Sequence, residues 1–416
     1  MATSIFPEEI MVDILSRLPV KSIKRFRCVC KPWCDLFSSP NFVKMHLNHH
    51  SIEKDNLTLL VNDGCHLYTV DYDSSLSTLC DIEAVKIDYP LIFPEDRYGE
   101  VDETSYPLIS SDNGVEILGS CNGILCFTTH DNDVIFLWNP STKEHKKLQG
   151  AGYSEYFRCS IRVPYGFGYG CKIDDYKLVS IFYNFRFGSE VEVYTLGSNS
   201  WKKLKNIPYI VSSDLNRPGV LVNECLHWIA SPNNGLKKNR GSKDSKVIVS
   251  FDINDEIFLE VSHPEQLDDK FGKHLGVLGG CLCLVSSLAM DDNVESVDVW
   301  VMKEYGVRES WTKMFTIAQE TLGECIDKLR PIQSFKNGKI LLETEDNDTN
   351  ALVLYDPKHE TSRVLNIRGI LEGWEWFETE SYVRSLVPLK SRKLKKKNKK
   401  RKAIENMKCK KTNKKR

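Results

Sequence analysis

A glycine-rich run near the middle of the chain is the first segment whose residue types could carry out chemistry. The run is GFGYG at 166–170, and glycines at such spacing cradle phosphates when they join a strand to the N-terminus of a helix. Here acidic residues and a second apolar run, YKLVSIF at 176–182, follow instead of a helix. We therefore expect the glycines to form a turn and not a phosphate-binding loop.

Histidines and aspartates supply other polar groups that could form a site. His46 and His50 are four residues apart, which places them on one face of a helix. A closed zinc site needs four ligands, and no nearby cysteine or carboxylate pair completes one, so we expect a solvated helix end. Two pairs of aspartates fall in expected turns, where the side chain bonds its own backbone: Asp174 with Asp175, and Asp252 with Asp255.

The sequence shows no serine or cysteine combined with histidine and an acid in a context that supports nucleophilic catalysis. The 14 cysteines are scattered and make no paired C-x-x-C framework, so we expect small buried apolar side chains and not ligands or disulfides. No catalytic residue, cofactor or metal is predicted. Five tryptophans are expected to fill space between sheets: Trp138, Trp201, Trp228, Trp300 and Trp311.

Charge divides the chain into an acidic body and a basic tail. The 416 residues carry a net charge of −1, but residues 390–416 hold 16 Lys or Arg and one acid, so the remainder carries about −16. This asymmetry indicates a tail that acts separately. No run of about 18 uncharged apolar residues occurs, and Glu8 and Glu9 stand where a signal peptide is basic. We expect no membrane partner, and a location in the nucleus, the cytoplasm or both.

Prolines divide the first 48 residues into three or four expected short helices. One apolar stripe at helical spacing begins after Pro7 and ends at Pro19, a second spans 23–37, and a last helix is expected over 41–47. A unit of this size cannot bury all its apolar side chains alone. Two interpretations stay open at this point: a helical cap on the following domain, or a docking surface for another protein.

The residues LSRLPVKSIKRFRCVCKPW at 15–33 closely resemble the F-box of plant F-box proteins in order, spacing and residue type. The resemblance implies an F-box over 1–48, which binds the Skp-type adaptor of a cullin–RING ubiquitin ligase. The adaptor-facing positions that it implies are Phe6, Pro7, Ile10, Leu15, Leu18, Pro19, Val29, Cys30 and Trp33.

Two of these positions depart from the residues that the family usually has. Phe6 stands where leucine is usual and Cys30 where serine is commoner, and both side chains can still pack. Trp33 is the best single anchor, because truncating a large aromatic side chain at an interface commonly costs about 2 kcal/mol or more. The alternative is that Trp33 only holds the helices together.

From residue 57 to 389, short β-branched and aromatic runs separated by turn residues indicate an all-β domain. A strand–turn–strand unit recurs at 134–148, 191–204, 247–261, 297–314 and 352–365. A repeat near 50 residues is typical of kelch-type propeller blades. The aligned aromatic residues of the units are Trp138, Tyr194, Phe251, Trp300 and Tyr355.

Segments with a glycine or asparagine turn lie between these units and are the expected inner strands, at 116–127, 218–230, 274–285 and 335–343. Residues 57–73 are expected to belong to a further blade, and 380–389 to supply the strand that closes the ring. Six blades are therefore predicted. Closure of the ring leaves no long exposed sheet edge.

The body also resembles a known family. The segments FLWNPSTKE, PYGFGYGCKIDDYKLV, LHWIA and ESYVRSLVPL are similar to the F-box-associated interaction domain of plant F-box/kelch-repeat and S-locus F-box proteins. Gly170 stands where that family usually has aspartate. The resemblance implies a non-catalytic receptor whose β-propeller, over 57–389, binds a target protein for ubiquitination and proteasomal degradation.

The tail has the form of a nuclear-import signal, with two basic clusters split by AIENM, and its like charges predict disorder over 390–416. Nucleic-acid binding by phosphate neutralisation and an inert solvated tail are open alternatives. Base stacking is not expected, because no aromatic residues are interleaved. The first cluster contains Lys395, Lys396, Lys397, Lys399, Lys400, Arg401 and Lys402.

The sequence thus predicts a receptor that joins an unknown protein target to a Skp-type adaptor and, through it, to a cullin–RING core. Such a receptor acts by raising the effective concentration of a target lysine near the conjugating enzyme. Three alternatives stay open: a scaffold that acts without ubiquitylation, a propeller enzyme such as a sugar-active oxidase or hydrolase, and a nuclear protein that binds nucleic acid through the tail.

Overall fold

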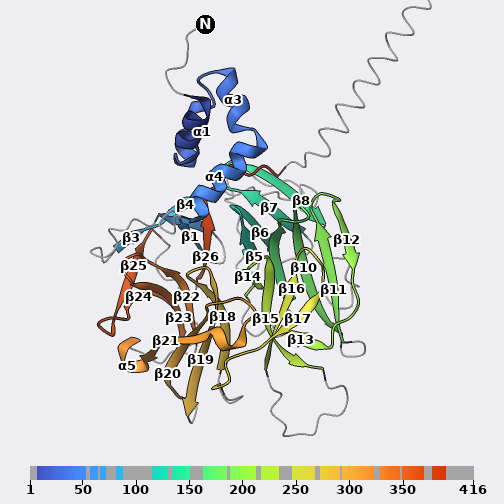
Figure 1. The fold of residues 1–416 in the computed structure, drawn as a ribbon. Coiled ribbons are helices and arrows are strands. Elements are labelled where there is room, and N and C mark those ends of the chain that lie inside the picture. Colours follow the sequence, from blue (N-terminus) through green and yellow to red (C-terminus); the bar gives the residue numbers. More distant parts are fainter. Residues whose placement is uncertain are drawn as a thin grey trace, which may run out of the picture.

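The computed structural model describes residues 7–52, 57–63, 66–71, 81–87, 115–129, 134–149, 163–184, 188–211, 217–233, 246–267, 272–290, 293–322, 328–346, 349–369 and 377–389. These residues form a small helical unit above a six-bladed β-propeller (Figure 1). The predicted fold class, a small all-helical unit followed by an all-β propeller, is confirmed. Phe6 and the basic cluster 395–402 lie outside the described residues.

Four helices make up the N-terminal unit, and prolines begin most of them. The helices are α1 (Glu8–Ser16), α2 (Val20–Phe26), α3 (Lys31–Phe37) and α4 (Pro40–Ile52). Pro7 and Pro19 precede α1 and α2 as N-terminal caps, where the missing N–H of proline costs no helical hydrogen bond. The last helix is longer than the predicted 41–47, so the helical unit continues to Ile52.

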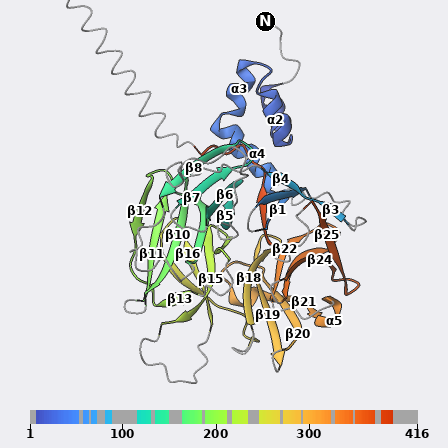
Figure 2. The same ribbon diagram turned by 180° about the vertical axis from the view of Figure 1, so that it is seen from behind.

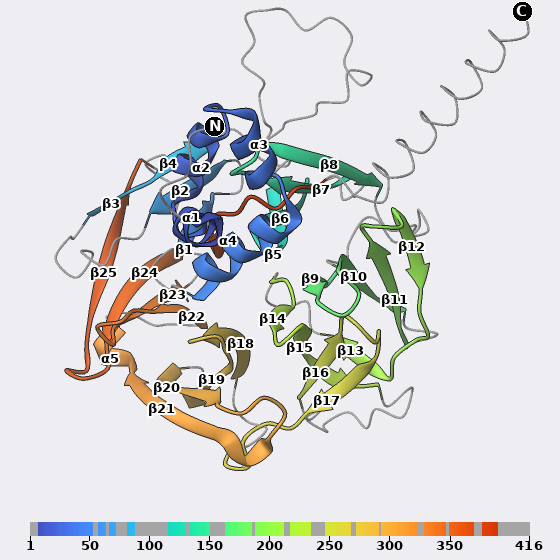
Figure 3. The same cartoon turned by 45° about the horizontal axis from the view of Figure 1, so that its top comes forward.

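Each blade is an antiparallel sheet whose strands follow one another from the propeller axis outward (Figure 3). The first blade contains β26 (Glu378–Val383), β1 (Leu57–Asn62), β2 (Leu67–Asp71) and β4 (Val85–Ile87). The second contains β5 (Val115–Cys121), β6 (Ile124–Thr129), β7 (Val134–Asn139) and β8 (Glu144–Gln149). The third contains β9 (Tyr165–Gly170), β10 (Asp175–Asn184), β11 (Gly188–Thr195) and β12 (Ser200–Lys203).

The remaining three blades continue the pattern around the ring. The fourth contains β14 (Val220–Val222), β15 (Cys225–Pro232), β16 (Val247–Asp252) and β17 (Phe258–Val261), with β13 (Tyr209–Val211) also paired to β15. The fifth contains β18 (Gly272–Leu278), β19 (Cys281–Met290), β20 (Asn293–Met302) and β21 (Trp311–Ala318), followed by α5 (Gln319–Leu322). The sixth contains β22 (Lys328–Ser334), β23 (Ile340–Asp346), β24 (Thr349–Asp356) and β25 (Thr361–Arg368).

Two strands close the ring from opposite ends of the chain. The C-terminal β26 pairs antiparallel with β1, with Val383 opposite Leu57, so the predicted closing strand is confirmed, although it spans 378–383. The N-terminal β3 (Asp81–Glu83) pairs in parallel with β25, with Asp81 opposite Asn366. This second closure was not predicted from the sequence. Each closure covers a strand edge that would otherwise present unpaired backbone groups.

The aligned aromatic residues occupy one equivalent place in five of the blades. Each lies in the third strand from the axis, in β7, β11, β16, β20 or β24, and each is buried. The predicted repeat is therefore confirmed. Large flat side chains at this position fill the space between neighbouring sheets, which must pack about 10 Å apart. The residues are Trp138, Tyr194, Phe251, Trp300 and Tyr355.

The glycine-rich run forms a strand and not the predicted turn. It is β9, the inner strand of the third blade. A methyl group on Gly166 would lie 2.7 Å from the Trp228 ring, and one on Gly168 would lie 2.3 Å from Ile253. The prediction was wrong because these glycines are required by close packing against the fourth blade, which no local pattern shows.

For the aspartates and cysteines, the predicted roles hold only in part. Asp252 behaves as expected for a turn, since its carboxylate accepts hydrogen bonds from the backbone N–H groups of Asn254 and Asp255 at 2.7 and 2.9 Å. The cysteines are less uniform than predicted. Among the nine in the described residues, all free, Cys28, Cys30 and Cys171 are exposed, so burial does not hold for every one.

Candidate functional site

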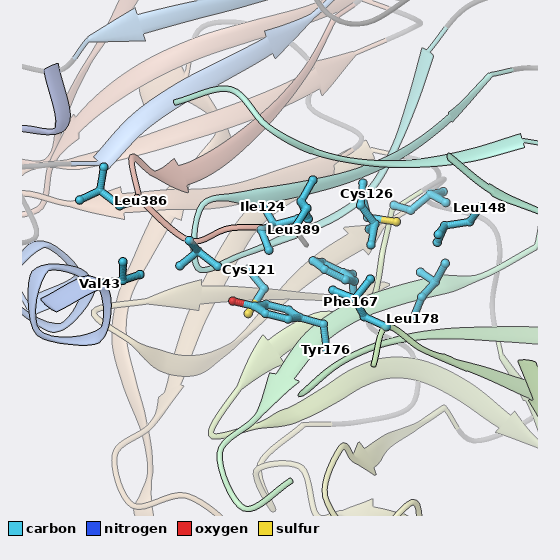
Figure 4. Packing of buried hydrophobic residues seen from close by; sticks show 14 of the residues in the cluster. Val43, Cys121, Ile124, Cys126, Leu148, Phe167, Tyr176, Leu178, Leu386 and Leu389 are labelled. Atoms are coloured by element: carbon cyan, nitrogen blue, oxygen red, sulfur yellow. The ribbon is translucent and has the colours of Figure 1, made fainter. Parts of the chain in front are cut away.

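An apolar junction joins the helical unit to the propeller. Phe42 and Val43 of α4 are buried in the same cluster as Leu386 and Leu389, which follow the closing strand. Figure 4 shows Val43 and Leu386 at the left, with side chains of the second and third blades to their right. Burying apolar side chains contributes roughly 1.5–3 kcal/mol each. The junction therefore holds the helical unit on one end of the propeller.

Buried polar contacts secure the C-terminal side of this junction. The Asn139 amide donates hydrogen bonds to the carbonyl oxygens of Ser385 and Val387, at 3.2 and 2.8 Å. The Ser385 hydroxyl in turn donates to the Asn122 carbonyl oxygen at 2.6 Å. Because removing such a partner leaves a buried polar group unsatisfied, each contact favours one position of the segment.

Two histidines bind the last helix to the end of the first. His46 and His50 lie side by side with ring centroids 4.2 Å apart, and both Nε2 atoms donate to the Leu18 carbonyl oxygen, at 3.0 and 3.1 Å. Both residues are buried. The predicted solvated helix end is therefore wrong, because the carbonyl groups after α1 need donors that α1 itself cannot supply.

Burial also changes the protonation of this pair. The pKa of His46 is lowered to about 4, first because burial disfavours the charged imidazolium and second because His50 lies beside it. The neutral ring retains one N–H, which is the donor used toward Leu18. The arrangement is thus a structural tie, and among the described residues no cluster of three or more histidine, cysteine or acidic side chains could hold a metal ion.

Three large apolar side chains on the helical unit remain exposed to solvent. Ile10 and Ile14 on α1 are 50% and 53% exposed, and Val29 between α2 and α3 is 65% exposed. Figures 1 and 2 show that α1 and α3 stand above α4. Helix α2 reaches the propeller through Lys24, whose Nζ donates to the Ser141 carbonyl oxygen at 2.8 Å. We call Ile10, Ile14 and Val29 the apolar face. Its exposure favours a partner protein that covers it.

The structure divides the nine predicted adaptor-facing positions into several groups. Leu18 and Trp33 are partly buried, and Leu15 is only 6% exposed because it packs in the helical core. Leu15 is therefore buried in this conformation and does not form part of the apolar face. The exposed positions are Pro7, Ile10, Pro19, Val29 and Cys30.

Sequence reasoning missed Ile14, which is as exposed as Ile10. The signal was available, because residues four apart lie on the same side of a helix. It was missed because the adaptor-facing positions were taken from the F-box resemblance, which implied Ile10 of this apolar stripe but not Ile14. A stripe at helical spacing does not itself reveal which of its members face inward and which are left for a partner.

Trp33 of α3 holds α2 and α3 together. Its ring packs edge-on against Phe26 of α2 at 5.5 Å and against Phe37 at 5.9 Å between ring centroids. Aromatic pairs in this geometry contribute about 0.5–1.5 kcal/mol beyond the area that they bury. A Trp33 substitution would therefore disturb the helical unit itself, so exposed residues are the better probes of a binding surface.

Comparisons with known proteins connect this architecture to a family. An F-box domain model matches residues 4–45, and a model described as the F-box associated beta propeller domain matches residues 81–389. The chain belongs to the F-box proteins with an F-box-associated β-propeller domain. The resemblance noted in the sequence is confirmed, and neither matched family is a family of enzymes.

Relatives of this F-box protein in Arabidopsis thaliana match more than four-fifths of its length. The F-box protein CPR1 is 32% identical over 412 residues, which cover 93% of this chain and 89% of the relative. The F-box/kelch-repeat protein At3g23880 is 29% identical over 340 residues, covering 81% and 85%. The F-box protein At4g22390 is 29% identical over 401 residues, covering 92% and 90%.

F-box domains typically bind Skp-type adaptors in SCF (Skp–cullin–F-box) complexes, and this chain has such a domain. In the described part of the chain, none of the helices has the length and apolar character needed to cross a membrane. Because the apolar face is exposed on the F-box, it is the best candidate for the surface that binds such an adaptor.

We expect the stability of the protein to fall as pH decreases from 6.5 toward 4. In this range the unfolded chain protonates His46, while the folded chain, with its pKa of about 4, does not. At pH 5 the loss from this residue is about 1–2 kcal/mol. Urea unfolding at pH 7 and pH 5 measures it, and His46→Gln should shrink the difference.

The control for this experiment is His145→Gln, since His145 is an exposed histidine on β8. This variant should keep the full pH dependence of the wild type. Equal pH dependence in His46→Gln and the wild type would contradict the structural tie between α4 and Leu18.

Proposed function

We propose that this chain is the substrate-recognition subunit of an SCF-type ubiquitin ligase. The observation that carries the proposal is the apolar face of the F-box, which the propeller leaves uncovered. Ile10, Ile14 and Val29 are half or more exposed, although α4 of the same unit is buried against the propeller. A Skp-type adaptor that covers them would link the chain to a cullin–RING core.

The basic residues near Val29 in the sequence support a partner with an acidic surface at this part of the face. Lys21, Arg25 and Lys31 lie on α2 and α3, on either side of Val29 in the sequence, and all three are exposed. Charged groups at the rim of an interface mainly raise the association rate and select the partner. We therefore propose that an apolar contact at Val29 is surrounded by salt-sensitive contacts to acidic groups of the adaptor.

The chain would contribute position and not bond-making chemistry. The propeller would hold a protein target while the F-box holds the ligase core, so that a target lysine lies near the charged conjugating enzyme. The apolar junction supports this role, because Phe42, Val43 and Leu389 are buried together and keep the two parts in one arrangement. Ubiquitination would then lead to proteasomal degradation of the target.

An assay of ubiquitin transfer separates this proposal from a scaffold that acts without ubiquitylation. The chain is reconstituted with adaptor, cullin–RING core and conjugating enzyme, and a target found by proximity labelling is added. A receptor gives modified target only when this chain is present. A scaffold captures the adaptor and target but leaves the target unmodified, which would overturn the ligase proposal.

The location of the protein is a separate proposal that rests on its basic tail. We propose that residues 395–402, with seven Lys or Arg, direct nuclear import. Replacing these seven with alanine should shift a fluorescent fusion of the full chain from the nucleus toward the cytoplasm. Replacing the basic residues after AIENM tests the second cluster. An unchanged distribution in both variants would remove import from the account.

Val29→Asp should weaken binding of the Skp-type adaptor by about tenfold or more, because it places a charge in the centre of a desolvated contact. Val29 is 65% exposed, so the folded chain should tolerate the substitution. Binding is measured by titrating labelled adaptor with the full chain.

The matched control is Leu259→Asp on β17, an outer strand of the propeller, where Leu259 is 56% exposed. This variant places the same charge at a similarly exposed apolar position outside the F-box and should bind the adaptor as the wild type does. Full adaptor affinity in Val29→Asp would show that the adaptor uses another surface.

A further inference from the structure

The outer strand of each blade has one backbone edge that must be protected from pairing with other chains. Lysines on an edge strand discourage such pairing, and the outer strands β4, β8, β12 and β21 all carry lysine. The outer strand of the sixth blade, β25, is covered instead by β3. The edge lysines are Lys86, Lys146, Lys147, Lys202, Lys203 and Lys313.

The fourth blade lacks this protection along β17. The strand contains no Lys or Arg, its pairing with β16 has no bulge, and no strand of the described residues lies beyond it. It also presents large apolar side chains to solvent, since Ile257 and Leu259 are 47% and 56% exposed. An edge with these properties favours the addition of another strand.

The hydrogen bonds of β17 show which backbone groups are left for such a strand. The Asp252 N–H donates to the Ile257 carbonyl oxygen at 3.0 Å, so the backbone groups of Ile257 face β16, and those of Leu259 do so at the next alternate position. The N–H and C=O groups of Phe258 and Glu260 must then face outward. Among the described residues, nothing forms a hydrogen bond with these four groups.

The two faces of β17 differ in character. Val261 is buried against the fifth blade, and because side chains alternate along a strand, Ile257 and Leu259 point to that same face. Phe258 and Glu260 point to the opposite face, where Phe258 packs in the cluster shared with the third blade. A strand added at this edge would meet apolar groups on one face and an acidic group on the other.

The charge around β17 is negative. Residues 252–267 contain five acids and no Lys or Arg. Two of the acids, Asp255 and Glu256, form salt bridges with lysines of the third blade. Within the described part of the chain, Glu260 has one polar contact, from the Tyr209 hydroxyl at 3.3 Å. No salt bridge there offsets the charge of Glu260 beside the open edge.

A partner for this edge must match both faces. Opposite charges placed across a pair of strands stabilise it, and like charges destabilise it. A second copy of this chain, paired through its own β17, would bring acid to acid and is a poor match. The match is an extended segment that has apolar side chains at alternate positions and a Lys or Arg on its other face.

We propose that the target protein docks at the free edge of β17 by adding such a strand, with apolar residues beside Ile257 and Leu259 and a basic residue beside Glu260. The inference rests on the proposed function, since it names the segment of the target that the receptor holds. In strand addition, main-chain hydrogen bonds give affinity and alternate side chains give specificity. Figure 3 shows β17 on the outside of the ring, apart from the helical unit, so this site leaves the apolar face free for the adaptor.

A peptide selection tests the site. A random-peptide phage library is first depleted on full-length Leu259→Lys and then selected on the full-length wild type. The surviving peptides should share alternating apolar residues and a Lys or Arg, and the best peptide is synthesised with a fluorescent label for titration.

Methylation of backbone N–H groups in the best peptide distinguishes strand addition from docking through side chains alone. One alternate set of these groups would face β17 and the other would face solvent. Methylating the first set should abolish binding, whereas methylating the second should change the affinity less than about twofold, because solvent-facing groups make no ladder hydrogen bonds. Equal effects of the two sets would contradict strand addition.

Leu259→Lys should weaken the best peptide about tenfold or more, because it gives β17 the protection that other outer strands have. Glu260→Gln should weaken it about threefold, and this loss should shrink at high salt. Val364→Lys is the matched control, since Val364 is 60% exposed on β25, whose edge β3 covers, and should bind the peptide as the wild type does.

All three variants should unfold at the urea concentration of the wild type and bind the adaptor equally well. The site would be overturned by a selection that leaves no peptide, or by equal peptide affinity in the wild type and Leu259→Lys. A dimer of the full chain that Leu259→Lys dissolves would assign the edge to a second copy, and tighter peptide binding after removal of residues 390–416 would assign it to the tail. Each of these results leaves adaptor binding and the ligase proposal untouched.

Discussion

The apolar junction between α4 and the segment after the closing strand is the interaction on which the rest of the structure depends. Burial of Phe42 and Val43 with Leu386 and Leu389 commits one side of the helical unit to the propeller. The other side must then face solvent, because so small a unit cannot enclose all its apolar residues. The exposed face of the F-box is a consequence of this arrangement.

The ring of blades gives the junction a rigid base at one end of the propeller. The closing strand β26 and the parallel strand β3 join the beginning and end of the propeller, so the blades cannot separate without breaking long-range pairs. The helices stand on one end of this ring (Figure 1). A receptor that works by proximity needs such a fixed arrangement, because a mobile connection would lower the effective concentration.

The sequence predicted those features that repeat or that depend on neighbours in the chain. Blades were visible because each unit places an aromatic residue in its third strand, such as Trp138, and helices were visible because prolines mark their beginnings. Features that depend on distant residues were not visible: the pairing of β3 with β25, the contact of Gly168 with Ile253, and the tie of His46 to Leu18. In the candidate site, residue type showed what could bind but not which side chains face outward.

The most direct test of the account is hydrogen–deuterium exchange of the full chain with and without a Skp-type adaptor. The account predicts slower exchange in α1 and in the residues between α2 and α3, where Ile10, Ile14 and Val29 would be covered. Exchange in β17, an outer strand of the propeller, should not change. Protection confined to the propeller, with α1 and Val29 exchanging as in the free protein, would contradict the claim that this face binds the ligase core.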